Sequence, residues 1–391
     1  MSTATRPFCW SEGATCCVCG ATALEEISAF SARRRVTSDC RPWAAGGRLA
    51  VCAACACVQK PADADLLRQL DAIYAGYAIY HQGGGAEQAL FDPQGQAAPR
   101  SFLLVEALCS RLALPPSGRL LDVGCGNGAT LRAFSEARPG WSLVGTELDD
   151  RHRSRIESIR GVESLLTCAP KDAPGQFDLI TMVHVLEHVP CPAALLADLR
   201  GKLSGTGLLV VEAPDYTRNP FDLLIADHCA HYSAATVARL LRRAGYAATV
   251  AEDWLPKEWT AVARAAAAAP FAPLPEVAPA SVRQSVESDL RWLARVVEAA
   301  RHVAQRGNLG VFGTSIAAAW LFAELEGLVG FFVDEDPNRF GRSYLGRAVC
   351  HPSQVPAGSE VFLALPGSAA SRIRRRLQQE GVVYHLPPER S

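Results

Sequence analysis

The chain has 391 residues, of which 49% are hydrophobic, and its 39 Lys and Arg nearly balance its 40 Asp and Glu. This length suffices for two or three domains with separate cores, and the balanced charge argues against a broad basic surface for nucleic acid. No apolar run has the form of a signal peptide, and none approaches the ~20 residues that span a bilayer. We therefore expect a cytoplasmic protein without nucleic-acid or membrane partners.

Cysteine is concentrated at the N-terminus, where eight of the fourteen cysteines fall within the first 57 residues. In a cytosolic protein such crowding indicates metal binding more often than disulfides. Two C-x-x-C pairs, Cys16/Cys19 and Cys52/Cys55, can each aim two thiolates at one tetrahedral Zn²⁺. We therefore predict a zinc-binding domain over residues 1–65, with a structural metal because four protein ligands leave no open position. Four further cysteines are alternative ligands: Cys9, Cys17, Cys40 and Cys57.

From about residue 100 to residue 262, apolar runs alternate with amphipathic stretches. Strands that run into loops are expected at 118–128, 141–150, 177–188 and 205–215. Helices are expected at 101–114, 129–138 and 234–246. This alternation is typical of a doubly wound parallel sheet. We assign residues 66–262 to this α/β core.

A glycine-rich loop, "LLDVGCGNG", lies between the first expected strand and the helix that follows it. Gly124 and Gly126 let the backbone pass close to a ligand, where a Cβ would collide. The next strand ends in Glu147, whose carboxylate can hold both hydroxyls of a ribose. The G-x-G-x-G spacing, opened by Asp122, resembles motif I of the class I S-adenosylmethionine-dependent methyltransferases, whereas dinucleotide-binding folds use G-x-G-x-x-G.

That resemblance implies S-adenosylmethionine as the cofactor. Gly124 and Gly126 would lie under its methionine part, and Glu147 would hold its ribose. Asp122 would fix the loop or the amino group. The alternative is an ordinary tight turn without a ligand.

The segment His184-Val-Leu-Glu187-His188 matches H-x-x-E-H, an inverted zinc-protease signature that requires a helix. Here it continues directly from an expected strand, and Pro190 and Pro192 follow at once. It resembles instead the end of the fourth strand in class I methyltransferases, which forms the floor of the cofactor pocket. We therefore expect His184, near the strand tip, to face the cofactor, and we reject the metalloprotease interpretation.

The stretch "LIADHCAHYS" (224–233) places Asp227, His228, Cys229 and His231 within five positions. All four side chains can bind metal or take part in proton transfer. A metal site would require Asp227, His228 and His231 to converge on a helix or tight turn. Cys229 is then the one nearby residue that could act as a fourth ligand. We favour acid–base chemistry, with a metal site and a structural or substrate-contacting role as the alternatives.

The C-terminal part begins with residues 263–281, whose Ala/Pro-rich composition is typical of an interdomain linker. A long helix is expected next, so that linker and helix together occupy 263–306. Alternation then resumes over 307–391, which predicts a second, smaller α/β domain. Its first strand leads into Gly313 and its second ends at Asp334, a separation compatible with a ribose contact. The alternative is a scaffold domain without a ligand.

Taken together, these blocks resemble the sugar C-methyltransferases, which act on nucleotide-linked keto sugars. Residues 51–60 ("VCAACACVQK") are similar to the family's second cysteine pair, and 74–85 ("YAGYAIYHQGGG") occupy its tyrosine-rich segment. Residues 333–349 resemble its D-x-x-P-x-K-x-G-x-x-x-P-G stretch, with Arg339 and Leu345 in the Lys and Pro positions. The resemblance implies a Rossmann-like class I methyltransferase core between a zinc-binding domain and a C-terminal Rossmann-like domain. It also implies that the substrate's nucleotide rests against the C-terminal domain, with the methyl acceptor in the cleft.

In that family a Tyr-x-Glu-His segment, followed by an aromatic residue and Ser, lines the active site. Matched by position, Asp227 and His228 take the Glu and His places, Tyr232 takes the aromatic place, and Ile225 replaces the tyrosine. The resemblance implies His228 as the base that removes a proton beside a ketone, with Asp227 as its partner. Further candidates for catalysis are His231 and Tyr232. Possible substitutes for the missing phenol are Tyr74, Tyr77, Tyr80 and His231.

We therefore predict a zinc-containing methyltransferase that uses S-adenosylmethionine to methylate a carbon of a nucleotide-linked keto sugar. One alternative is an O-methyltransferase acting on another polysaccharide or natural-product acceptor. Another is a zinc-ribbon binding protein built on a degenerate methyltransferase scaffold.

Overall fold

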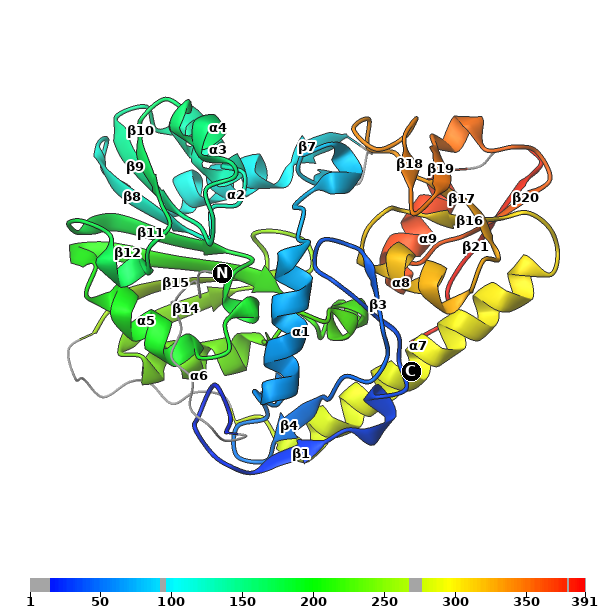
Figure 1. Ribbon diagram of the computed structural model, residues 1–391, viewed down its shortest axis with the longest axis horizontal. Helices are drawn as coiled ribbons and strands as arrows, with labels where there is room; N and C mark the ends of the chain where they lie inside the picture. Colours follow the sequence, from blue (N-terminus) through cyan, green and yellow to red (C-terminus); the bar gives the residue numbers. More distant parts are fainter. Residues whose placement is uncertain (1–14, 92–95, 267–275, 378–379, 391) are drawn as a thin grey trace.

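The computed structural model describes residues 15–91, 96–266, 276–377 and 380–390. Two α/β units lie side by side, and a small N-terminal sheet lies against both (Figure 1). Among the described residues, no helix is long and apolar enough to cross a membrane. The N-terminal prediction for Cys9 falls outside the described residues.

The central unit is built on a seven-stranded sheet with the order β10-β9-β8-β11-β12-β15-β14. Its strands are β8 (Gly118–Val123), β9 (Trp141–Thr146), β10 (Val162–Leu166), β11 (Phe177–Val183), β12 (Leu203–Pro214), β14 (Tyr246–Ala251) and β15 (Glu258–Ala265). The first five strands in this order are parallel, and β15 is antiparallel to both of its neighbours. The strand order reverses between β8 and β11, so a ligand crevice is expected beyond their carboxyl ends.

Helices cover both faces of this sheet because alternate residues of each strand point to opposite sides. Leu120 of β8 packs with α2 (Arg100–Arg111), α3 (Ala129–Ala137) and α4 (Arg153–Glu157). Leu121, its neighbour in sequence, packs on the other face with α5 (Pro192–Arg200) and α6 (Ala234–Arg243). This arrangement explains the near-continuous apolar runs in the strands.

The predicted linker begins too early, because residues 263–265 complete β15. Trp259, Ala261 and Ala263 point into the core in alternation, and β15 pairs with both β12 and β14. Pairing on both sides makes an Ala-rich strand stable where composition alone indicates a linker.

The N-terminal cysteine-rich segment forms a sheet with the order β1-β4-β5-β13. Its strands are β1 (Leu24–Glu26), β4 (Ala50–Cys52), β5 (Val58–Gln59) and β13 (Ala230–His231). The last strand comes from the central unit, and a separate parallel bridge joins Val36 to Ile225. Between these segments lie η1 (Ser28–Phe30), β2 (Arg35–Val36), β3 (Pro42–Trp43) and α1 (Ala64–Ala75). The N-terminal domain therefore shares a sheet with the segment that carries His228.

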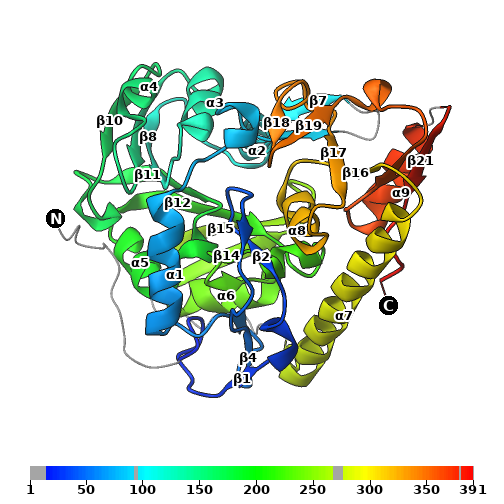
Figure 2. The same ribbon diagram turned by 45° about the vertical axis from the view of Figure 1, so that its right-hand side comes forward.

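The C-terminal unit has a six-stranded sheet with the order β18-β19-β17-β16-β20-β21. Its elements are β16 (Leu309–Phe312), α8 (Ile316–Glu324), β17 (Val329–Val333), β18 (Ser343–Tyr344), β19 (Arg347–Cys350), β20 (Ser359–Phe362), α9 (Gly367–Arg376) and β21 (Val382–His385). Helix α7 (Pro279–Ala304) runs from the N-terminal sheet to this unit (Figure 2).

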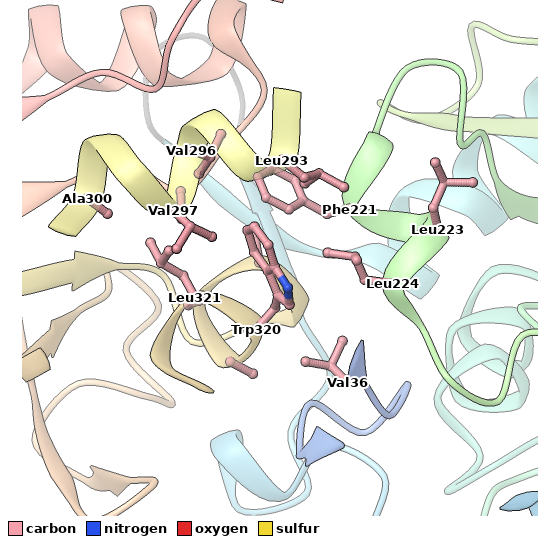
Figure 3. Close-up of a cluster of buried hydrophobic side chains, with 14 of the residues drawn as sticks. Val36, Phe221, Leu223, Leu224, Leu293, Val296, Val297, Ala300, Trp320 and Leu321 are labelled. Carbon is pink, nitrogen blue, oxygen red and sulfur yellow. The ribbon is translucent and has the colours of Figure 1, made fainter. Parts of the chain in front are cut away.

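A shared hydrophobic core joins these parts (Figure 3). Trp320 of α8 packs edge-on against Phe221 of η5 (Pro220–Leu224), with ring centroids 5.8 Å apart. Val36 from the N-terminal domain and Val296 from α7 belong to the same cluster. Because this core is continuous across all three parts, the loop that follows η5 is held between them.

Candidate active site

The glycine-rich loop follows β8 at the point where the strand order reverses. Gly124 and Gly126 have φ angles of 67° and 57°, which side chains other than glycine rarely adopt. A Cβ on Gly124 would lie 2.6 Å from Val185 Cγ2, and one on Gly126 would lie 2.9 Å from Ile79 Cδ1. The loop therefore needs glycine both for its backbone conformation and for its close neighbours.

Glu147 and Gly126, predicted to bind one cofactor, meet directly. The Glu147 carboxylate accepts hydrogen bonds from the backbone N–H of Gly126 (2.8 Å) and of Leu148 (2.8 Å). Asp122 lies within the sheet, where its carboxylate accepts a hydrogen bond from Thr181 Oγ1 at 2.7 Å. Burial raises the pKa of Asp122 to about 7. The predicted strand–loop–strand unit is thus present, with Glu147 at the ligand side and Asp122 beneath the loop.

The tyrosine-rich segment lies across the glycine loop. Asn127 Nδ2 donates to the carbonyl of Gly85 at 2.8 Å, and Arg151 Nη1 donates to the carbonyl of Tyr77 at 2.7 Å. The segment continues through η2 (His81–Gly83) to a hairpin of β6 (Ala89–Phe91) and β7 (Ala97–Pro99). It therefore brings Tyr77 and Ile79 to the edge of the expected cofactor site.

His184 directly follows β11 and has a left-handed φ of 53°, which is unusual for a residue with a side chain. Its Nε2 lies 3.0 Å from Glu258 Oε1, and Arg100 Nη1 lies 3.2 Å from the same oxygen. Although burial opposes ionisation, Arg100 and His184 lower the pKa of Glu258. Burial raises the pKa of Glu212 beside this group well above its usual value. His184 therefore sits at a strand tip facing a buried carboxylate cluster.

The H-x-x-E-H segment does not form the helix that a zinc protease requires. It includes the short 3₁₀ helix η4 (Leu186–His188), which directly follows the β11 strand end. Glu187 is 2% exposed, and neither of its carboxylate oxygens has a hydrogen-bond partner among the described residues. Potential ligand atoms of Glu187, His188 and His228 lie within 4.8 Å of one another. The segment thus contributes to the same site as the His228 loop.

His228 faces a carboxylate that the sequence did not single out. Its Nδ1 lies 3.1 Å from Asp222 Oδ1, and His231 Nδ1 lies 2.7 Å from Asp222 Oδ2. All three side chains are buried, and the two imidazoles lower the pKa of Asp222 although burial opposes its ionisation. Burial, reinforced by the nearby Lys60 ammonium, lowers the pKa of His231 to about 4. Asp222 therefore forms a hydrogen bond with His231 and lies within ion-pair distance of His228.

Asp227, predicted as the partner of His228, makes different contacts. It accepts hydrogen bonds from Ser38 N (2.8 Å) and Ser38 Oγ (2.5 Å), and its Oδ2 lies 3.4 Å from His188 Nδ1. Burial alone would lower the pKa of His188, but Asp227 raises it to about 8. Asp227 therefore contacts Ser38 and His188, whereas His228 lies beside Asp222, and the role of Asp227 as the partner of His228 stays a prediction. Adjacent side chains then point toward different neighbours, and the His188 and His228 rings meet edge-on at 4.7 Å.

The two remaining catalytic candidates, His231 and Tyr232, are both buried. His231 is in β13 and shares Asp222 with His228. Tyr232 is 1% exposed and packs edge-on against Trp259, and its hydroxyl has no hydrogen-bond partner within the described ranges. Tyr232 therefore belongs to the core of the central unit, and its role in proton transfer stays a prediction.

Ile225 occupies the place of the family tyrosine and belongs to the shared hydrophobic core. Tyr74 and Tyr77 bring phenols to the histidine cluster instead. Tyr74 Oη lies 3.0 Å from His188 Nδ1, and Tyr77 Oη lies 3.2 Å from Ser38 Oγ. These two tyrosines are therefore the best-placed substitutes for the missing phenol.

The four predicted zinc ligands converge. Cys16 Sγ lies 3.4 Å from Cys55 Sγ, and Cys19 Sγ lies 3.6 Å from Cys52 Sγ. All four sulfur atoms lie within 4.8 Å of one another. Thiolates bound tetrahedrally to zinc at about 2.3 Å would be about 3.8 Å apart, so the donor set fits this metal. The alternative ligand Cys40 lies elsewhere, with its thiol toward the carbonyl of Ser38.

Cationic side chains of α6 border the cysteine cluster. Arg243 Nη1 donates to the carbonyl of Val18 at 2.9 Å, within the first cysteine pair. Arg239 and Arg242 line the surface pocket beside Cys19.

The glycine loop of the C-terminal unit is closed by its own side chains. Asp334 accepts hydrogen bonds from Thr314 Oγ1 (2.7 Å) and from the backbone N–H of Asp336 (3.0 Å). Arg339 Nη1 donates to Thr314 Oγ1 at 2.9 Å. The carboxylate predicted to hold a ribose is therefore engaged within the loop, whereas a Cβ at Gly313 would meet open space.

Comparison with known proteins identifies the central unit. Residues 98–250 match the family model described as a methyltransferase domain. The chain carries a class I S-adenosylmethionine-dependent methyltransferase domain. The predicted fold class is thus confirmed.

Curated relatives match about a third of the chain. A ubiquinone biosynthesis O-methyltransferase of Xanthomonas campestris is 31% identical over 146 residues, which cover 35% of this chain and 57% of that protein. A trans-aconitate 2-methyltransferase of Variovorax paradoxus is 31% identical over 121 residues, which cover 29% of this chain and 46% of that protein. The chain thus spans about half the length of these relatives.

Solved structures are more distant. The mitomycin 7-O-methyltransferase MmcR has a TM-score of 0.39 and 16% identity, covering 51% of this chain and 67% of that one. A similarity of this size has no bearing on substrate or mechanism.

Proposed function

We propose that the protein transfers a methyl group from S-adenosylmethionine to the carbon beside a ketone of a nucleotide-linked sugar, with His228 as the base. The observation that carries this proposal is the buried Asp222–His228 pair, 3.1 Å apart. It lies next to the segment that follows β11, at the carboxyl side of the sheet where the cofactor loop is found. An imidazole beside a carboxylate suits removal of a proton from a substrate.

The residues around the glycine loop fit the cofactor. Gly124 and Gly126 hold the loop in conformations that a Cβ would obstruct, and Glu147 places its carboxylate beside the loop at ribose-binding spacing. When bound, S-adenosylmethionine supplies an electrophilic methyl group. The protein's own task is then to align the acceptor and remove its proton.

In the proposed step, His228 Nε2 takes the proton from the carbon, and Asp222 stabilises the imidazolium through Nδ1. The electron pair of the broken C–H bond leaves the carbon nucleophilic and shifts charge toward the ketone oxygen. His188 supports that charge, because Asp227 keeps it protonated through neutral pH. Tyr74 and Tyr77 are the phenols within reach of this cluster.

A second candidate is O-methylation of another acceptor. It is favoured by Ile225, which removes the family's phenol, and by a curated relative whose name includes O-methyltransferase. The same base can take a proton from a hydroxyl group. The two candidates therefore differ in the atom that receives the methyl group.

The experiment is incubation with ¹³C-methyl S-adenosylmethionine and nucleotide-linked 4-keto sugars, followed by NMR of the product. C-methylation predicts a carbon-bound methyl group, lost in His228→Ala and retained in the neighbouring control Cys229→Ala. A methyl group bound to oxygen supports the second candidate. Methyl transfer at the wild-type rate by His228→Ala would refute His228 as the base in both candidate reactions.

A further inference from the structure

Lys60 is a buried lysine that the proposed chemistry does not use. It is 3% exposed, and its ammonium group donates to the backbone carbonyls of Ile225, at 2.6 Å, and His228. Burial of an ammonium group is costly unless the charge is compensated and its hydrogen bonds are made. Here the carbonyls accept the hydrogen bonds, and two buried carboxylates, Asp222 and Asp227, compensate the charge.

The backbone around Lys60 makes further contacts with the same loop. Lys60 N donates to the carbonyl of Cys229 at 2.9 Å, and β5 continues this pairing with Ala230 opposite Gln59. On the other side of the loop, Ala226 N donates to the carbonyl of Val36 at 2.6 Å. The loop that carries His228 is thus held on two sides by the N-terminal domain.

Lys60 is also tied closely to the cysteine cluster. Strand β5 pairs with β4, which ends at Cys52, and Cys52 N donates to the carbonyl of Cys57 at 2.9 Å. The ligand Cys55 lies in the turn of this hairpin, five residues before Lys60. A metal held at the turn would therefore fix the strand from which Lys60 extends.

We propose that Lys60 is a positioning residue that connects the metal-bound cysteine hairpin to the loop of the catalytic base. The N-terminal domain then acts on the active site by holding Ile225 and His228 in place, and its metal has no part in the chemistry. The catalytic consequence rests on the proposed function, whereas the structural connection does not.

The test compares Lys60→Met with Lys202→Met. Lys202 is a matched control because its ammonium also donates to a backbone carbonyl, that of Ala173, outside this cluster. The readouts are hydrogen exchange of residues 225–231, the NMR titration of His231, calorimetric binding of S-adenosylmethionine, and kcat.

In Lys60→Met we expect at least tenfold faster exchange in 225–231 and an upward shift of the His231 pKa, because a nearby positive charge is lost. We expect cofactor affinity within twofold of wild type and a kcat reduced at least tenfold. Lys60→Arg, which keeps the charge and donors, should recover part of kcat. Lys202→Met should leave all four readouts near wild type.

Wild-type exchange rates in 225–231 and an unchanged His231 titration in Lys60→Met would overturn the proposal. If neither Lys60 variant folds, chelation of the wild-type protein provides the test. Metal removal should then speed hydrogen exchange in residues 50–60 and 225–231 together, while residues 123–128 stay protected. Faster hydrogen exchange confined to residues 50–60 would overturn the proposal. An inactive wild type with these exchange results would refute the proposed function and leave the connection standing.

Discussion

Asp222→Asn tests the carboxylate pairing of the base most sharply. The substitution keeps the shape of the side chain but removes the negative charge that faces His228 at 3.1 Å and His231 at 2.7 Å. General base catalysis contributes roughly 10²- to 10⁴-fold, or about 3 to 5 kcal/mol at ~1.4 kcal/mol per tenfold. Because an amide cannot stabilise the imidazolium and can favour the wrong tautomer, we expect kcat to fall by about 10²-fold or more.

The assay is methyl transfer at saturating cofactor, with calorimetric binding of S-adenosylmethionine as a measure of an intact fold. The matched comparison is Asp227→Asn, which removes an equally buried carboxylate that faces His188 and Ser38. We expect Asp227→Asn to lower kcat less than Asp222→Asn. Near-wild-type kcat in Asp222→Asn, together with its loss in Asp227→Asn, would refute the assignment and restore the pairing expected from the sequence.

Three further predictions follow from the structure. Gly126→Ala should weaken S-adenosylmethionine binding at least tenfold in calorimetry, because its Cβ would approach Ile79 to 2.9 Å at a φ of 57°; unchanged affinity would contradict the cofactor assignment. Cys16→Ser should reduce zinc content, measured by atomic emission, from one ion per chain to none and lower the melting temperature, whereas an unchanged metal content would exclude the four-cysteine site. Asp227 raises the pKa of His188 to about 8 in the folded protein, whereas the pKa of histidine in the unfolded chain is about 6.5. The ion pair therefore stabilises the fold fully below about pH 6.5, and this stabilisation is lost as the pH rises through 8. Asp227→Asn should remove this decrease in the free energy of unfolding, measured by urea denaturation between pH 6 and 9. The same pH dependence in the wild type and in Asp227→Asn would count against the His188–Asp227 pair.

The cofactor loop could be predicted from the sequence because its parts are close along the chain. Gly124, Gly126 and Glu147 belong to one strand–loop–helix–strand unit, and the register of parallel strands brings the loop and the next strand end together. The two cysteine pairs could be predicted in the same way, because each places two potential ligands in a single tight turn.

The pairing of His228 could not be predicted in this way. Asp222 lies in a 3₁₀ helix without a motif, and its contact with His228 depends on how the chain turns between η5 and β13. That turn is set by Lys60, 168 residues away in sequence, and by the bridge from Val36. Adjacency in sequence made Asp227 the obvious partner, but long-range contacts decide the direction of each side chain.

His188 lies in the histidine cluster although its motif does not form a protease helix. The H-x-x-E-H segment contains only a short 3₁₀ helix, and its position after a strand points first to His184. His188 lies one short 3₁₀ turn further on, where it contacts both Asp227 and His228. The signal was a second histidine after a strand end, which motif spacing alone could not place.

The most direct test of the account is deuterium incorporation into a nucleotide-linked 4-keto sugar incubated with the protein and S-adenosylhomocysteine in deuterated water. The account predicts incorporation at the carbon beside the ketone, abolished by His228→Ala and retained by Cys229→Ala. Incorporation at the same rate in His228→Ala would contradict the role of His228 as the base.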